Sequence, residues 1–134
     1  MEPTNVNIWV VLTCTLINLV LGMVWYSPNV LGNLWAQEHG FTSDQLKASI
    51  WHYLGAIIVA FIMSYVLDMI MHTFGVRGIG NGIALGFFIW LGFIATTHFS
   101  GVIWAKKPFI VFFIDAGYLL FNLILIGAIM GAWQ

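Results

Sequence analysis

The chain has 134 residues, of which 61% are hydrophobic and 7% are charged, and its formal net charge is −1 at pH 7. Soluble domains carry about 25% charged residues, so this composition excludes a free water-soluble enzyme, a disordered chain and a nucleic-acid-binding module. We therefore expect an integral membrane protein, with the lipid bilayer as its surroundings and no nucleic acid as a partner.

Four apolar stretches follow one another along the chain, and each has the length of about 20 residues that a membrane-spanning helix needs. Their approximate ranges are 6–26, 49–74, 81–104 and 109–133. Helix-breaking residues separate them, since Pro28 follows the first, Gly75 ends the second and Pro108 suits the first turn of the fourth. The sequence thus predicts an all-α fold, a four-helix membrane bundle with short connections, in one domain covering residues 1–134.

The connection after the first helix is the exception, because residues 27–48 exceed the usual length of about 4–6 residues. Leu34 and Trp35 predict a short amphipathic segment on the lipid headgroups, or a lid over a polar site. Thr42 and Gln45 have the spacing of a capping box, which favours an earlier start for the second helix.

Charge asymmetry between the loops predicts the topology. Four spans place both termini on one side of the membrane, together with a loop that carries only Arg77. The loops of the opposite side carry Lys47, Lys106 and Lys107. Because cytoplasmic loops are enriched in Lys and Arg, we expect both termini to lie outside.

Several stretches carry a family resemblance when they are read together. They are Gly22–Pro28, Trp90–Thr97, Ile114–Tyr118 and Gly127–Trp133. In this order and spacing they resemble the bacterial membrane family catalogued as domain of unknown function 1761, over nearly the whole chain. The resemblance implies a four-helix protein of the bacterial inner membrane, and it implies no established activity.

A second, shorter likeness lies in the third helix. Residues 92–100 are similar to a segment of small fluoride channels, which also have four helices and dimerise in dual topology. Those channels carry a glycine-rich motif ending in Arg-Tyr in their first helix. The motif is absent from this sequence, so we set this likeness aside.

Ionisable side chains inside a bilayer mark candidate sites, because each costs about 2.5 to 3.5 kcal/mol at the centre of a helix. His98 and Asp115 flank the last connection at similar distances, so a helical hairpin puts them at one depth, and His52 can join them. Tyr118 and Asn122 continue the helix face of Asp115. The predicted ligand or ion pathway comprises Asn18, His52, Thr96, Thr97, His98, Asp115, Tyr118 and Asn122.

Two alternatives for these residues stay open. Interhelical hydrogen bonds that hold the bundle together are one, each worth about 0.6 kcal/mol. A metal site made of His52, His98 and Asp115 is the other, although no His-x-x-His or paired-cysteine spacing supports it. We assign no metal ligand, and the sequence identifies no cofactor.

Asp68 and His72 form a second polar pair, one turn apart near the far end of the second helix. They can pair locally or act as a proton relay. Small residues upstream of them predict a close helix crossing. Glycines four residues apart predict a second crossing, within a subunit or between subunits, and they are Gly78, Gly82, Gly86, Gly127 and Gly131.

No recognised catalytic motif occurs in the sequence, so no enzyme activity is assigned. The leading hypothesis is a channel, transporter or carrier-like protein for a small solute or ion. The alternative is a structural or accessory subunit that binds another membrane protein. Four short helices enclose little volume, so if a site exists we expect subunits to form part of it, and we therefore expect a homo-oligomer.

Overall fold

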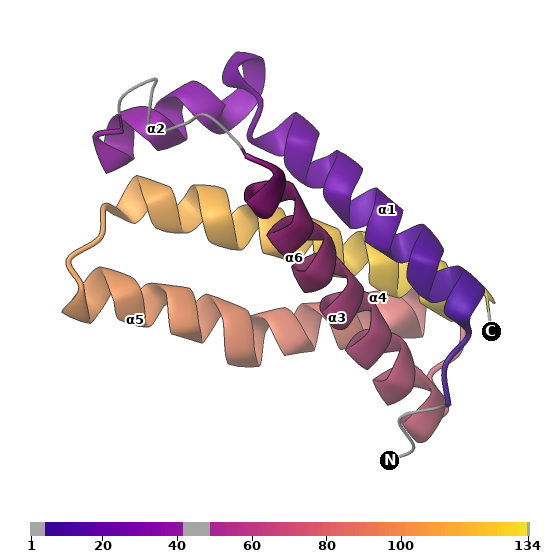
Figure 1. The fold of residues 1–134 in the computed structure, drawn as a ribbon. Helices are drawn as coiled ribbons and strands as arrows, with labels where there is room; N and C mark the ends of the chain where they lie inside the picture. Colours follow the sequence, from indigo (N-terminus) through magenta and orange to yellow (C-terminus); the bar gives the residue numbers. More distant parts are fainter. Residues whose placement is uncertain (1–4, 42–48, 134) are drawn as a thin grey trace.

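The computed structural model describes residues 5–41 and 49–133, and helices dominate this part of the chain. In order, the elements are α1 (Ile8–Trp25), the π-helical turn η1 (Pro28–Gly32), α2 (Asn33–His39), α3 (Ile50–Phe74), α4 (Ile79–Ile89), the π-helical turn η3 (Trp90–Ala95), α5 (Thr96–Trp104) and α6 (Phe109–Trp133). The predicted all-α fold is confirmed, as Figure 1 shows.

Four segments of the described chain are long and apolar enough to cross a membrane: α1, α3, the continuous run from α4 to α5, and α6. The chain is therefore a multi-pass membrane protein, and lipid surrounds its helices. The helix ends agree closely with the apolar runs. The third span begins at Ile79, two residues before the expected position, and its middle widens into η3.

Local hydrogen bonds fix the starts of two spans. The Asn7 side chain caps α1 by accepting a hydrogen bond from the backbone N–H of Trp9 at 3.1 Å. A capping box formed by Ser49 and His52 begins α3. The capping box expected at Thr42 lies outside the described residues.

The four spans form two packed pairs, α1 with α3 and α4 with α6, and α1 also lies against α6 (Figure 1). The buried core occupies the end of the molecule where the chain termini lie. Its members are Val10, Val11, Cys14, Leu67, Met71, Leu123, Ile126 and Met130. Towards the other end the helices diverge, and the first ten residues of α3, from Ile50 to Val59, are exposed. This divergence creates the cavities described below.

The crossing of α4 and α6 depends on glycine. A Cβ atom at Gly82 would lie 2.0 Å from the backbone oxygen of Gly127, and one at Gly131 would lie 2.2 Å from that of Gly78. Gly78 also donates a backbone hydrogen bond to Gly131 at 2.8 Å. The predicted glycine crossing is thus confirmed, and it joins two helices of one chain.

Part of the long first connection is helical, since α2 contains Leu34 and Trp35. Within α2, Ala36 is buried and the helix packs against α6. The Trp35 ring meets the Tyr26 ring edge to face, with centroids 5.8 Å apart. This contact holds α2 beside the end of α1.

Candidate functional site

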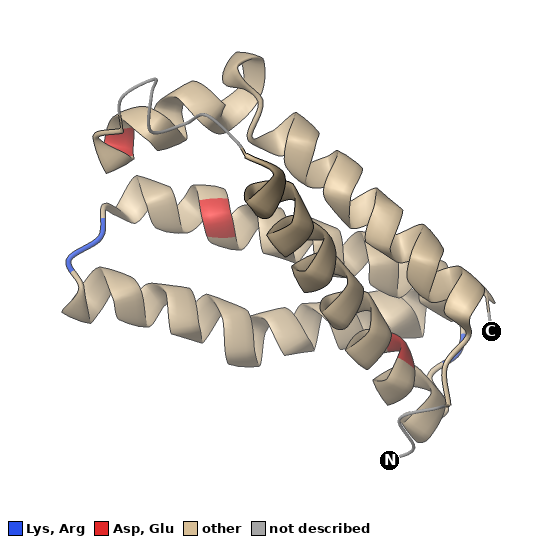
Figure 2. Ribbon diagram, viewed as in Figure 1, with Lys and Arg blue, Asp and Glu red and all other residues tan. Residues whose placement is uncertain are grey.

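Asp115 is the acidic residue of α6, and it lies in the half of that helix nearer the turn with Lys106 and Lys107. Figure 2 shows the basic residues of this turn at one end of the hairpin that α5 and α6 form. The carboxylate is half-buried. The Tyr26 hydroxyl donates a hydrogen bond of 2.5 Å to Asp115 Oδ1. Because a carboxylate inside a membrane needs a hydrogen-bond donor, Tyr26 lowers the cost of keeping this charge in the span.

Tyr26 lies one residue beyond the end of α1. Burial first, and then the hydrogen bond to Asp115 and the charge of that carboxylate, raise the pKa of Tyr26 above its ordinary value. The hydroxyl therefore remains protonated throughout the physiological pH range. It acts as a constant donor to Asp115.

A second polar contact joins α1 and α6 one helical turn deeper. The Tyr118 hydroxyl donates to Asn18 Oδ1 at 2.5 Å, and Asn18 is 6% exposed. A Cβ atom at Gly22 would lie 3.1 Å from the Tyr118 hydroxyl oxygen, so the glycine leaves room for the ring. The rings of Tyr26 and Tyr118 meet at a centroid distance of 5.5 Å. Polar and aromatic groups thus extend continuously from Asn18 to Asp115.

Asn122 lies deeper still and is fully buried. Its amide nitrogen is 3.4 Å from the sulfur of Met63, and the amide of Asn18 is 3.8 Å from the same sulfur. Thioether sulfur is a weak acceptor. These contacts tie α1, α3 and α6 together at mid-span, which is a packing role.

His98 and Asp115 face one small pocket of about 140 Å³, between α5 and α6, which Thr97 and Lys107 also line. A space of this volume is large enough for several water molecules. His98 Nδ1 lies 3.0 Å from the carbonyl oxygen of Ile94, so it carries the proton and leaves Nε2 as the remaining polar atom of the ring. The two predicted partners therefore share a pocket without a direct hydrogen bond between them.

The turn after α5 directs a lysine towards this pocket. Lys106 adopts a left-handed backbone conformation with a φ of 55°. Lys107 then donates its backbone N–H to the carbonyl of Gly101, and its side chain lies over that glycine, with Cδ 3.4 Å from the position of a Cβ. A cation and a carboxylate thus line the same 140 Å³ space.

Not all predicted residues join this pocket. His52 lines a separate cavity, which α1, α3 and α6 form, and it does not reach the pocket of Asp115. Thr96 is exposed and donates to the Gly92 carbonyl at 2.8 Å. Within the described residues no group of three His, Cys, Asp or Glu side chains is placed to hold a metal ion.

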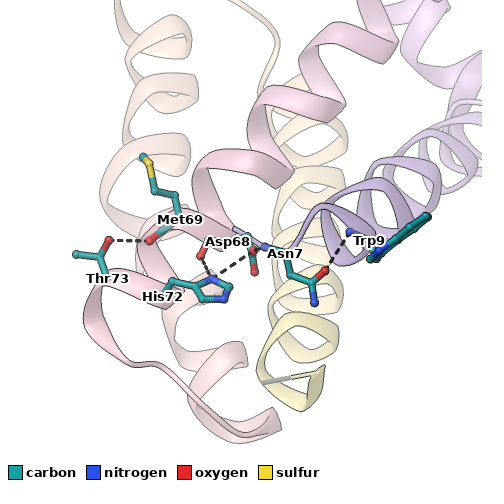
Figure 3. Close-up of polar contacts among 6 residues, drawn as sticks. All are labelled: Asn7, Trp9, Asp68, Met69, His72 and Thr73. Atoms are coloured by element: carbon teal, nitrogen blue, oxygen red, sulfur yellow. Dashed lines mark hydrogen bonds and ion pairs between the residues drawn. The ribbon is translucent and has the colours of Figure 1, made fainter. Parts of the chain in front are cut away.

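The second polar pair lies at the opposite end of the molecule, where the structure brings Asp68 and His72 together (Figure 3). Asp68 is fully buried, and its Oδ2 lies 3.4 Å from His72 Nδ1. The same oxygen accepts the backbone N–H of Asn7 at 2.9 Å. Figure 3 shows Asp68 between His72 and Asn7. The Asp68 carboxylate therefore links the start of α1 to α3 and acts as a structural clasp.

Sequence reasoning left Tyr26 and Lys107 out of the site. An aromatic residue at a helix end is typical of a membrane-interface anchor, and a loop lysine of the topology signal. The available signal was depth, since Tyr26 follows the end of the first span and Asp115 lies in the first two turns of the fourth, on the same side. Asn7 was also missed, although an Asn just before an apolar run is typical of a helix cap.

Removing the Tyr118 hydroxyl tests the interhelical contact. Tyr118→Phe is expected to lower the free energy of unfolding in detergent by about 0.6 kcal/mol, with an upper bound of about 1.7 kcal/mol. Tyr53→Phe is the matched control, because the Tyr53 hydroxyl has no hydrogen-bond partner among the described residues and its ring is 56% exposed. Equal losses in the two variants would show that the contact with Asn18 adds nothing to stability.

Comparison with known proteins agrees with the sequence resemblance. The model of a family described as "Protein of unknown function (DUF1761)" matches residues 9–131. No curated protein and no solved structure matches the chain. The match covers all four spans and supplies no reaction, so any function has to be argued from the site.

Proposed function

The chain belongs to the DUF1761 family of proteins of unknown function, and from its geometry we propose that it is a small channel, transporter or carrier-like protein for a small solute or ion. The observation that carries the proposal is the pocket of about 140 Å³ in which Asp115, His98, Thr97 and Lys107 meet. Charged groups around a hydrated space inside a membrane span are typical of solute and ion pathways.

The arrangement around Asp115 supports a binding role. Its Oδ1 is already hydrogen-bonded to Tyr26, which fixes the orientation of the carboxylate. Its pocket also presents a lysine ammonium and the free ring nitrogen of His98. A solute that enters therefore meets both hydrogen-bond donors and acceptors, and can exchange its hydration shell for protein groups.

The same proposal includes the setting of the protein. We place it as a single four-span unit in the inner membrane of a bacterium, with both termini outside, because lysines cluster on the loops of the opposite side. We propose a homo-oligomer, since the other helices of the chain leave most of α5 and the first half of α3 exposed. A neighbouring subunit on these faces completes the walls of a pathway.

A structural or accessory subunit that binds another membrane protein is the second candidate. It is favoured by the contacts of Tyr118 with Asn18 and of Asn122 with Met63, which pair predicted pathway residues with each other or with a packing residue. Under this proposal the uncovered helix faces contact a partner of a different sequence. The two candidates differ in whether the purified protein alone permits flux.

Neutralising Asp115 tests the proposal. Asp115→Asn keeps an oxygen that can accept from Tyr26, so the fold is expected to survive, while the charge in the pocket is lost. Flux of protons, sodium and chloride is measured in liposomes containing the purified protein. We expect the flux that wild type supports to fall at least about tenfold, a barrier change of about 1.4 kcal/mol.

Glu38→Gln is the matched control, because it removes one negative charge from an exposed position of α2. Its flux is expected to equal that of wild type. If Asp115→Asn also conducts like wild type, the pocket is not the pathway. If wild type conducts none of the three ions, the accessory role is favoured.

A further inference from the structure

A second cavity, of about 550 Å³, lies between α1, the exposed first half of α3 and α6, and it shares no lining residue with the Asp115 pocket. Its depth is lined by apolar side chains, among them Leu19, Val59 and Leu119. His52 and Tyr53 lie at its loop end. Asn18 and Tyr118 also line the cavity and are hydrogen-bonded to each other, so most of the remaining wall is apolar.

The cavity follows the helices and is closed at one end. From His52 to Met63 the wall provided by α3 is about 16 Å long, at about 1.5 Å per residue. Beyond Met63, α3 packs on α1, where Ser64 and Leu67 are buried. An occupant with a long apolar part therefore enters from the loop end or from the side, and ends at this crossing.

The polar end offers hydrogen-bond donors without a formal charge. The backbone N–H of Ser49 donates to His52 Nδ1 at 3.0 Å, so Nδ1 is the acceptor and the neutral ring carries its proton on Nε2. The hydroxyl of Tyr53 has no partner among the described residues, and its ring is 56% exposed. Two donors at the mouth of an apolar groove are complementary to an oxygen-bearing headgroup above a hydrocarbon chain.

We propose that this cavity is a binding site for one phospholipid of the surrounding bilayer. One acyl chain fills the groove between α1 and α3, and a phosphate or ester oxygen accepts from His52 and Tyr53 at its mouth. The volume lies within the range of about 300–1,000 Å³ found for small-ligand sites. The largely apolar wall does not suit a hydrated ion, and none of the residues that line this cavity lines the Asp115 pocket, which carries the proposed function.

The test uses the purified protein and a phosphatidylcholine with a photoreactive group in one acyl chain. Illumination and peptide mapping report which residues are labelled. Ala56→Phe fills part of the groove from α3. The added ring is expected to exclude about two methylene groups of the acyl chain, which weakens lipid binding and lowers labelling of the groove residues about tenfold. Gly55→Leu is the second variant, because a Cβ at Gly55 meets no atom within 4 Å.

Ala84→Phe is the matched control, since Ala84 is exposed on α4 and the same ring is added there outside the groove. The proposal is supported if wild type and the control are labelled at groove residues, while both groove variants lose this labelling and keep the melting temperature of wild type. Equal labelling of groove variants and control, or labelling confined to outward faces, would show an ordinary bilayer lipid and overturn the proposal. Retention of a different, non-lipid mass in native mass spectrometry would overturn it as well.

Discussion

Replacing Gly82 with alanine is expected to disrupt the packing of α4 on α6. The added Cβ would lie 2.0 Å from the backbone oxygen of Gly127, so one helix has to move away from the other. Overpacking of this kind costs about 1–3 kcal/mol, and here the obstacle is backbone, which cannot rotate aside. Thermal unfolding in detergent, followed by circular dichroism, measures the loss.

Gly80→Ala is the control for this prediction. It lies in the same helix, and a Cβ at this position meets no atom within 4 Å. Alanine is the better helix former by about 1 kcal/mol, so the control is expected to be neutral or slightly stabilised. Similar melting temperatures for Gly82→Ala and Gly80→Ala would contradict the close crossing.

Asp68→Ala is expected to have the largest effect on stability among side-chain truncations. It leaves the backbone N–H of Asn7 without its acceptor and His72 without its partner carboxylate. Leaving a buried hydrogen-bond donor without its acceptor costs about 1–3 kcal/mol, and more where the lost acceptor carries a charge. The loss is measured as a fall in the free energy of unfolding, and hydrogen exchange is expected to quicken in the first turn of α1.

Asp68→Asn separates the two contacts. Its side-chain oxygen still accepts from Asn7, while the carboxylate charge beside His72 is gone, so the loss is expected to be smaller than in the alanine variant. Glu38→Ala, on the exposed side of α2, is the control for removing an acidic side chain. A loss in Asp68→Ala no greater than in Glu38→Ala would contradict the role of Asp68 as a clasp.

The helices were predictable because their signals are local. Apolar runs of sufficient length, ended by Pro28 or Gly75, give the spans to within about two residues. The pairing of Asp68 with His72 is also local, since residues four apart share a helix face. The glycine motif predicted a close crossing, and only the structure places it between α4 and α6 of one chain.

Contacts between distant segments were predictable only in part. Tyr26 and Asp115 are 89 positions apart, and their hydrogen bond depends on how α1 lies against α6. The sequence gives the depth of each residue along its span. His98 and Asp115 have similar depths, and the structure places both in one pocket. Depth alone also favoured His52, which lies elsewhere because α3 crosses at an angle that hydropathy does not encode.

The central claim is that the Asp115 pocket is open to water, and cysteine labelling tests it most directly. Cys14 is buried and is the protein's single cysteine, so Cys14→Ala gives a background without thiols. Thr97→Cys then places a thiol in the pocket, and Phe113→Cys places one on an exposed face of α6 nearer the turn.

The reagent is a charged methanethiosulfonate, which does not enter lipid, applied to the protein in liposomes. The account predicts that Thr97→Cys reacts at least about tenfold faster than Phe113→Cys, although it lies deeper, because the reacting thiolate needs water. Equal rates, or labelling of Phe113→Cys alone, would show a dry pocket and contradict a solute pathway at Asp115.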